Sequence, residues 1–527
     1  MHMHGSFVHR GPALGACAIT RRDFLRGSVA LGAGVAISRL ALDAWEPVIA
    51  RAAEAELPPV TQFLGQDQVA ELLKIGLSKG AEFAEVYGEY TINTTFVLDE
   101  NELRQAQYGV LSGVGVRVID GDTVGYAYAD EFGMAGLREA ARVAAAIASK
   151  NEGGTPRAFA ASKAKAPFTL SRPSPLFATE VEKIELCQRA NATARAKDKR
   201  IQQVQVILAD SAKAILVANS EGVWAEDRQF VSRLAVQPTA IDGTNRQTGV
   251  AMAGGAVEAD YFTKVRTPEE TANEAADTAI ALLGAVEARA GSYPVIINRG
   301  WGGVLVHECF GHSLEGDGIR KKTSIRERQL NQKVAADIVD IWDDSTVPHA
   351  RGSFKVDDEG TPSQKSHVVE KGILKGYLWD RLNARLTGNV SSGNGRRNSY
   401  RDFPIPRMTN TYIAAGTTKP ADLFASVKNG LYCKNLGGGS VNPADGMFSF
   451  VVSEAYLIEN GKLTSAVKGA TLTGNAADAM LRVEGLGDDL SIDTRTGTCG
   501  KDGQWKPVGV GQPTVLFSEM TVGGTRA

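Results

Sequence analysis

The sequence predicts an α+β fold, with a mixed α/β N-terminal part and a β-rich C-terminal part. Helical and strand-like segments alternate up to about residue 290, whereas short strands and glycine-rich turns dominate after about residue 335. A chain of 527 residues is also too long for one ordinary hydrophobic core. We therefore predict two folded domains, residues 56–290 and 291–527, behind an N-terminal segment of residues 1–55.

The N-terminal segment, residues 1–55, is predicted to be a twin-arginine export signal and a linker. Residues 20–26, TRRDFLR, precede the weakly apolar run 27–42, GSVALGAGVAISRLAL, an order that is typical of such signals. The run is short for a membrane span and Arg39 interrupts it, so we predict no integral membrane segment. An amphipathic surface helix is the alternative. The prediction is export to the periplasm, or a cytoplasmic location if the signal is not used.

The N-terminal domain is expected to begin with a helix and a pair of strands. Strand-like runs cover 83–99 and 113–130, and a turn at Asp120-Gly121-Asp122 predicts a hairpin. Residues 67–80 precede them and are expected to form the helix, with Gly80 as its stop. Four apolar side chains share one face at helical spacing in that segment: Val69, Leu72, Leu73 and Leu77.

The rest of this domain is expected to alternate helices and strands. Residues 150–178 are rich in Pro, Ser, Ala and Lys, which is typical of a linker or long loop. Residues 267–289 carry acidic side chains in the first turn, which favours a helix start there. The other expected elements are helices over 133–149 and 178–197 and strands over 202–242.

The C-terminal domain is expected to be built mainly from short strands. Residues 293–300, YPVIINRG, predict a buried strand that ends at a glycine. Helices are expected only over 417–430 and 474–483, besides a helical segment near residue 307. Short strands are expected in 368–380, 409–416 and 447–463.

Charge and cysteine usage exclude some classes of protein. The net charge is −2, so no global field attracts nucleic acid or an anionic membrane. The five cysteines are scattered and odd in number, so no disulfide framework is predicted. Three of the seven histidines lie within the first nine residues, and two of the remaining four are five residues apart.

Those two histidines belong to residues 306–313, VHECFGHS, which differ from the H-E-x-x-H zinc signature by one additional residue. Five residues of regular α-helix rotate the second histidine by about 140° from the first, so a regular helix would not let both bind one ion. A local π-helix, or a helix that ends at Gly311, would bring them together. The spacing therefore predicts a distorted helix or a helix end.

The chemistry of the motif suits a metal site. His307, His312 and a third ligand would hold Zn²⁺ and leave one position for water. Bound Zn²⁺ lowers the pKa of that water from about 15.7 toward about 7, and Glu308 would accept its proton and pass it to a leaving amine. The alternative is two partly buried histidines near a turn, beside a surface glutamate.

The spacing does not choose the third ligand. Cys499 has the most site-like context, GTCGKDGQ, because flanking glycines permit close approach of the backbone. For any cysteine, the alternative is a small buried apolar side chain. The candidates are Cys309, Glu315, Asp317, His349, His367, Cys433 and Cys499.

Several longer segments carry a resemblance to a family. They extend from about residue 65 to the C-terminus, and the most specific are VHECFGHSLEGD, RGSFKVDDEGTP, GNGRRNSYRDFPIPRMTNTY, LGGGSVNPADGMFSFVVSEAYLIENGKL and TGTCGKDGQWKPVGVGQPT. With these segments the chain resembles the TldD branch of the TldD/PmbA metallopeptidases, a family also called modulators of DNA gyrase.

The resemblance implies a family-specific fold and a zinc-dependent peptidase. It implies that His307, His312 and Cys499 hold Zn²⁺ and that Glu308 activates the metal-bound water. The PmbA branch lacks the H-E-x-x-x-H signature, which this sequence keeps. The resemblance also implies cleavage of unfolded or short peptides, and a dimer that is either a homodimer or a heterodimer with a PmbA/TldE-like chain.

Two other functions compete with this one. The first is a non-catalytic binding or regulatory subunit of a TldD/PmbA-type assembly, against which the intact His-Glu-His set argues. The second is direct action on DNA gyrase or nucleic acid, which the net charge and the export signal both disfavour.

Two further segments are candidate contacts for a substrate. Residues 436–440, LGGGS, would present backbone N–H groups to a substrate carbonyl, or would form a plain tight turn. Arg396, Arg397 and Arg401 would pair with a substrate carboxylate, or would be structural or solvated arginines.

Overall fold

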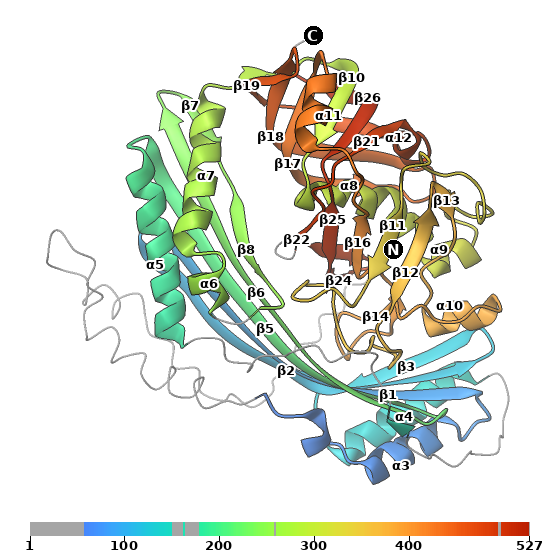
Figure 1. Cartoon of the computed structure of the whole chain (residues 1–527). Helices are drawn as coiled ribbons and strands as arrows, with labels where there is room; N and C mark the ends of the chain where they lie inside the picture. The colour runs from blue at the N-terminus through green and yellow to red at the C-terminus, as the bar shows by residue number, and fades with distance from the viewer. Residues whose placement is uncertain (1–56, 150–161, 164–178, 258–259, 494–496, 526–527) are drawn as a thin grey trace, which may run out of the picture. The chain divides into compact units, whose positions relative to one another are not determined.

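The fold is α+β, as the sequence predicts (Figure 1). The contacts described below lie within one compact unit, residues 56–178 and 182–527. No described helix is long and apolar enough to cross a membrane. The predicted export signal and nearly all of the predicted loop 150–178 lie outside the described residues. The computed structural model describes residues 57–149, 162–163, 179–257, 260–493 and 497–525.

The N-terminal domain is built on an eight-stranded sheet of order β3-β2-β1-β5-β6-β4, in which β7 and β8 also pair with β6. The predicted hairpin is confirmed, because Asp120 pairs with Thr123 and Gly121 adopts a φ of 62° in the turn. The strands are β1 (Phe83–Asp99), β2 (Glu102–Asp120), β3 (Thr123–Ala129), β4 (Ser162–Lys163), β5 (Ile201–Asn219), β6 (Val223–Asp242), β7 (Asn245–Thr248) and β8 (Ala251–Gly255).

Two pairs of helices cover this sheet (Figure 1). One core lies under α3 and α4, where the four predicted apolar residues of α3 are buried, and a second lies under α5 and α7. Two helices end earlier than predicted: α3 ends before a turn that leads to Gly80, and α7 ends at its cap, Gly284. The helices are η1 (Val60–Gln62), α3 (Gln66–Gly76), α4 (Met134–Ala148), α5 (Glu180–Lys197), α6 (Tyr261–Lys264) and α7 (Pro268–Leu283).

The C-terminal domain holds two further large sheets. An eight-stranded sheet has the order β17-β10-β26-β20-β18-β19-β9, with β21 paired to β26. A six-stranded sheet has the order β13-β12-β11-β16-β25-β22. The strands of the first are β9 (Val286–Glu287), β10 (Gly291–Ile297), β17 (Asn429–Val441), β18 (Met447–Glu459), β19 (Lys462–Lys468), β20 (Thr471–Asn475), β21 (Val483–Leu486) and β26 (Val515–Gly523). Those of the second are β11 (Ile341–Asp344), β12 (Lys365–Glu370), β13 (Ile373–Leu374), β16 (Asn410–Ile413), β22 (Ser491–Asp493) and β25 (Gly509–Gln512).

Two short hairpins and several short helices complete this domain. The helix α10 was not predicted, although Asp380 supplies a clear signal by accepting a hydrogen bond from the backbone N–H of Asn383 at 3.0 Å. The hairpins are β14 (Gly395–Arg396) with β15 (Ile405–Pro406), and β23 (Thr498–Lys501) with β24 (Gln504–Pro507). The helices outside the motif are α9 (Gly316–Arg320), α10 (Arg381–Leu386), α11 (Pro420–Ser426), α12 (Ala476–Ala479) and η5 (Met480–Arg482).

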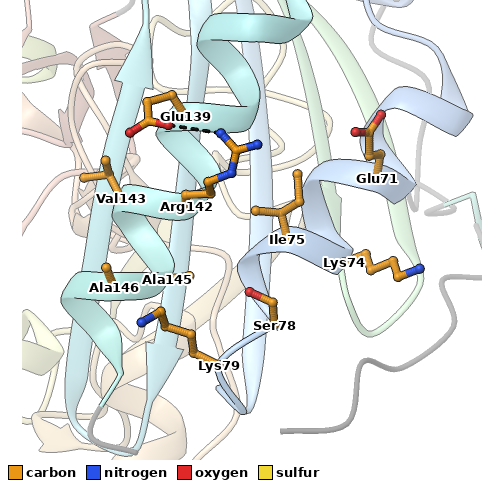
Figure 2. Close-up of a pocket in the computed structure, with 10 residues that line it drawn as sticks. All are labelled: Glu71, Lys74, Ile75, Ser78, Lys79, Glu139, Arg142, Val143, Ala145 and Ala146. Carbon is orange, nitrogen blue, oxygen red and sulfur yellow. Dashed lines mark hydrogen bonds and ion pairs between the residues drawn. The ribbon is translucent and has the colours of Figure 1, made fainter. Parts of the chain in front are cut away.

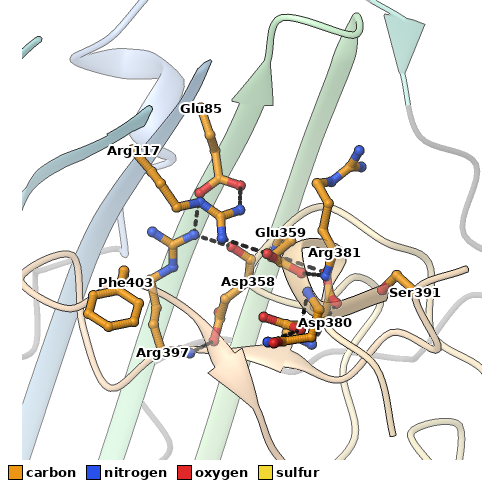
Figure 3. Close-up of polar contacts among 12 residues, drawn as sticks. Glu85, Arg117, Asp358, Glu359, Asp380, Arg381, Ser391, Arg397 and Phe403 are labelled. Atoms are coloured by element: carbon orange, nitrogen blue, oxygen red, sulfur yellow. Dashed lines mark hydrogen bonds and ion pairs between the residues drawn. The ribbon is translucent and has the colours of Figure 1, made fainter. Parts of the chain in front are cut away.

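A buried network of charges joins the N-terminal sheet to loops of the C-terminal domain (Figure 3). Glu85 of β1 binds Arg117 of β2 at 2.7 Å and also binds Arg397. Arg117 in turn binds Glu359 at 2.7 Å. Burial alone would raise the pKa of Glu85, but the charges of Arg117 and Arg397 outweigh burial and lower that pKa. Glu85 therefore stays ionised and holds two arginines that are 312 and 32 residues away in the sequence.

Replacing Glu85 with Gln is expected to lower the free energy of unfolding by about 3–5 kcal/mol, because two buried guanidiniums lose their shared carboxylate. Glu139→Gln is the matched control, since Glu139 pairs with Arg142 on an exposed helix face, where such a pair contributes about 0–1 kcal/mol. Urea denaturation of both variants measures the difference. Equal midpoints for the two variants would contradict a stabilising role for the network.

Candidate metal centre

The histidine motif lies in a π-helix, which confirms the predicted distortion. The backbone N–H of His312 donates to the carbonyl oxygen of His307, five residues earlier, as a π-helix requires. The two imidazole rings consequently lie side by side in an edge-to-face arrangement, with centroids 5.3 Å apart and planes at 83°. The segment comprises η2 (Gly300–Gly303), α8 (Val304–Val306), the π-helix η3 (His307–Gly311) and η4 (His312–Leu314).

Packing holds the π-helix in place. Cys309 and Phe310 are fully buried in the C-terminal core, and the guanidinium of Arg326 lies 4.4 Å from the centre of the Phe310 ring. Gly311 lies against Met408, so a Cβ at position 311 would come within 2.8 Å of the Met408 side chain. The core therefore fixes one face of the motif, and the two histidines occupy the other.

The β23–β24 hairpin brings Cys499 to the two histidines. Its Sγ lies 3.1 Å from Nε2 of His312, although the two residues are 187 positions apart. One potential ligand atom from each of His307, His312 and Cys499 lies within 4.8 Å of the other two, and this is the one such group among the described His, Cys, Asp and Glu side chains. Zinc–sulfur and zinc–nitrogen bonds of about 2.3 and 2.0–2.1 Å fit donors about 3–4 Å apart.

The other third-ligand candidates lie elsewhere or have other partners. Burial raises the pKa of the Cys309 thiol, and Cys433 is likewise buried and protonated in the core. His367 stacks on Trp342 with ring centres 3.8 Å apart and binds Asp340. His349 contacts the carbonyl oxygen of Ala256, and Asp317 binds Lys501.

Glu315, a further candidate, supports His312 instead. Its Oε2 lies 3.3 Å from Nδ1 of His312, while Lys501 and Arg407 lie 3.1 and 3.4 Å from its carboxylate. Burial alone would raise the pKa of Glu315, but the charges of Lys501 and His312 lower it to about 2. An ionised Glu315 accepts a hydrogen bond from a protonated Nδ1 and leaves Nε2 of His312 available as a ligand atom.

The donor set fits a zinc ion. Burial alone would raise the pKa of Cys499, but His307 and His312 lower it to about 5, which makes the thiolate the favoured form at neutral pH. The Nδ1 atom of His307 is buried and has no hydrogen-bond partner among the described residues. Two imidazoles and one thiolate form a three-ligand set of the kind that catalytic zinc sites use.

Glu308 lies beside this group. Its Oε2 is 3.8 Å from Nε2 of His312, and its side chain is 12% exposed. Burial raises the pKa of Glu308, while the neighbouring histidines partly oppose that rise. A carboxylate whose pKa moves toward neutrality is suited to accept and return a proton.

A surface hollow of about 770 Å³ lies elsewhere, between α3 and α4 (Figure 2). Three of its charged side chains have partners, since Glu139 binds Arg142 at 3.1 Å and Glu71 binds Arg138 at 2.6 Å. No residue of the candidate metal centre lines it. The hollow is therefore separate from the site that the sequence motif predicts.

The structure favours the structural alternative for the three arginines and excludes the tight-turn alternative for residues 436–440, whose contact with a substrate stays a prediction. Arg397 binds Glu85, Arg401 binds Asp130, and both terminal nitrogens of Arg396 donate to backbone carbonyls, so the structural alternative holds for all three arginines. Residues 436–440 form no tight turn, because they lie within β17, where the register shifts between Leu436 and Gly439. The carbonyl oxygen of Leu436 accepts a hydrogen bond from Nε1 of Trp301.

The supporting roles of Lys501 and Arg407 were not predicted. The sequence could have indicated the role of Lys501, because Lys501 lies two residues after Cys499 and alternate residues of a strand point to the same face. No sequence pattern indicates the role of Arg407, since it reaches Glu315 from a distant segment of the sequence.

The chain resembles known proteins over most of its length. Three domain models match it: PmbA/TldA metallopeptidase domain 1 at residues 84–148, the central domain at 174–283 and the C-terminal domain at 290–524. A metalloprotease TldD homolog of Haemophilus influenzae is 38% identical over 468 residues, which cover 88% of this chain and 97% of the relative. A zinc metalloprotease TldD homolog of Saccharolobus solfataricus is 31% identical over 237 residues, or 45% of this chain and 52% of the relative.

Solved structures share the fold. A Thermotoga maritima structure described as a modulator of a DNA gyrase matches with a TM-score of 0.72 at 22% identity, covering 88% of this chain and 99% of the other. TldE of Thermococcus kodakarensis matches with a TM-score of 0.67 at 18% identity, covering 91% and 100%. The domain matches and the 38% identical relative show that this chain belongs to the PmbA/TldD metallopeptidase family.

Proposed function

We propose that this protein is a zinc-dependent peptidase that hydrolyses peptide bonds in unfolded or short peptides. One observation carries the proposal: His307, His312 and Cys499 converge within 4.8 Å, and the Glu308 carboxylate lies beside them. The name of the S. solfataricus relative, a zinc metalloprotease, supports the choice of metal. The non-catalytic alternative would have no need for this combination of three donors and a proton acceptor.

The chain's own residues would divide the work as follows. A zinc ion on His307, His312 and Cys499 would supply Lewis-acid chemistry. Glu308 would accept a proton at its carboxylate from the attacking water and deliver it to the nitrogen of the departing amine. Glu315 would keep the proton of His312 at Nδ1, so that Nε2 faces the ion throughout.

The recessed position of the donors supports unfolded or short peptides as substrates. His307 is 3% exposed and Cys499 is 6% exposed. The backbone carbonyls of a folded protein would not reach atoms with so little exposure, whereas those of an extended segment would. Backbone pairing with a strand edge would hold such a segment with little dependence on its sequence.

The remaining parts of the proposal concern assembly and location. We propose a dimer, either of two copies of this chain or with a PmbA/TldE-like chain, and the similarity in fold to TldE supports the second form. Export through the twin-arginine route is supported by residues 20–26 and the run that follows them. That route carries folded proteins, which would allow the metal to bind before export.

Removing zinc tests the proposal. Wild-type protein is expected to cleave a short peptide and a denatured protein but to leave the same protein intact when it is folded. Stripping the metal with a chelator is expected to reduce hydrolysis by about 10³-fold or more, and added Zn²⁺ to restore it. Metal analysis accompanies each measurement. Zinc-loaded protein that cleaves no peptide, alone or with a TldE-like chain, would contradict a catalytic role.

A further inference from the structure

Two arginines from distant parts of the chain lie together beside the strand that carries Cys499. Arg233 lies on β6 and pairs across the ladder with Gly254 of β8. Just beyond β8, the backbone N–H of Ala256 donates to the carbonyl oxygen of His349 at 2.8 Å, two residues before Arg351. Arg351 in turn donates from Nε to the carbonyl oxygen of Gly497 at 3.2 Å, two residues before Cys499.

The position of Arg233 on β6 determines which way it points. Leu234 and Val236 are buried in the core under α5 and α7. Side chains alternate between the two faces of a strand, so Arg233 points away from those helices. Arg233 therefore lies on the sheet face opposite the helices. Its charge acts on Arg351, so the two guanidiniums are neighbours.

Within the part of the chain that the structure describes, Arg233 has no anionic partner. Among the described residues, no hydrogen bond or ion pair is formed by its side chain, and burial lowers its pKa. Burial and the charge of Arg233 together lower the pKa of Arg351 to about 10, and Asp493 opposes this only in part. The other buried arginines of the described chain each have a carboxylate or backbone carbonyls as acceptors: Arg117, Arg326, Arg396, Arg397 and Arg407.

Two neighbouring, half-buried guanidiniums repel each other unless an anion lies between them. A carboxylate is the matching ligand, because guanidinium groups bind its two oxygens through paired, charge-assisted hydrogen bonds. An unmodified linear peptide carries a carboxylate at its C-terminus. Acidic side chains offer the same group at other positions.

We propose that Arg233 and Arg351 bind the C-terminal carboxylate of the peptide substrate. The proposal deepens the proposed peptidase function and rests on it. Gly497 and Cys499 are two residues apart, which corresponds to about 7 Å of extended chain, so the guanidinium of Arg351 lies on the order of 10 Å from the metal-binding atoms. An extended peptide anchored by its C-terminus would therefore be cut about two to four residues from that end.

Steady-state kinetics on three matched peptides test the proposal. One has a free C-terminal carboxylate, the second has a C-terminal amide, and the third has the amide and one internal glutamate. Wild-type protein is expected to show a KM about 10- to 100-fold lower for the free acid than for the amide. Arg233→Met is expected to abolish that preference by raising KM for the free acid alone, with kcat unchanged.

Two further variants separate this effect from damage to the fold. Arg233→Lys is expected to keep part of the preference, because a positive charge remains. Arg142→Met removes an exposed arginine from α4 and is expected to keep all of it. The substitution Arg233→Met breaks no hydrogen bond or ion pair among the described residues, and it removes a charge that burial disfavours. The variant is therefore expected to melt at or above the wild-type temperature. A preference for the glutamate peptide over the free acid would overturn the assignment to the C-terminus.

Binding measurements distinguish failure of this proposal from failure of the peptidase function. Fluorescence anisotropy with labelled peptides is applied to zinc-loaded Glu308→Gln protein, with and without Arg233→Met. Tighter binding of the free acid that depends on Arg233 would support the site even if no peptide were hydrolysed. Equal binding of acid and amide would overturn the site even if hydrolysis were efficient.

Discussion

Glu308→Gln is expected to reduce peptide hydrolysis by about 10²–10⁴-fold while the protein keeps one zinc ion per chain. The amide preserves the shape of the side chain but cannot accept a proton from water. Glu308 is placed for that role, since its Oε2 lies 3.8 Å from Nε2 of His312 and burial raises its pKa. The loss is therefore expected mainly in kcat, with little change in KM, and kinetics beside metal analysis measure both.

Glu327→Gln is the matched control, since this glutamate pairs with Arg328 outside the metal centre and is expected to leave hydrolysis unchanged. Two results would contradict the assigned role. Full activity in Glu308→Gln would show that another group accepts the proton. Loss of zinc together with activity would show that Glu308 acts as a ligand or holds the ligands in place.

Cys499→Ala is expected to lose zinc and, with it, peptide hydrolysis. In the proposed site the thiolate would supply one of three donors, and two histidines alone would hold Zn²⁺ weakly. The loss of zinc affinity is expected to exceed the roughly 10–100-fold that follows from changing an outer partner of a ligand. Metal analysis after dialysis against a weak chelator measures the loss.

Cys309→Ala is the matched control for this experiment. Cys309 lies in the histidine motif itself, but its side chain is fully buried in the C-terminal core. Its replacement is expected to cost about 1 kcal/mol of stability through lost packing and to leave zinc bound. Zinc retained in Cys499→Ala and lost in Cys309→Ala would reverse the ligand assignment.

Local sequence determined much of the fold and the part of the candidate site that lies in the motif, namely His307, Glu308 and His312. Alternation and the turn at Asp120-Gly121-Asp122 predicted β1 and the β2–β3 hairpin, and apolar spacing predicted the buried face of α3. In the motif, the five-residue spacing from His307 to His312 is incompatible with a shared metal on a regular helix. That spacing predicted the π-helix, because the rotation per residue is a local property of the backbone.

Only the tertiary structure decided which distant residues complete the site. Spacing left seven candidates for the third ligand, and Cys499 reaches His312 from 187 residues away because the β23–β24 hairpin packs beside the motif. The pairing of Arg397 with Glu85 and the approach of Arg351 to Arg233 arise in the same way. Backbone preference and side-chain periodicity act over a few residues, whereas these contacts depend on how whole sheets pack, which no short segment encodes.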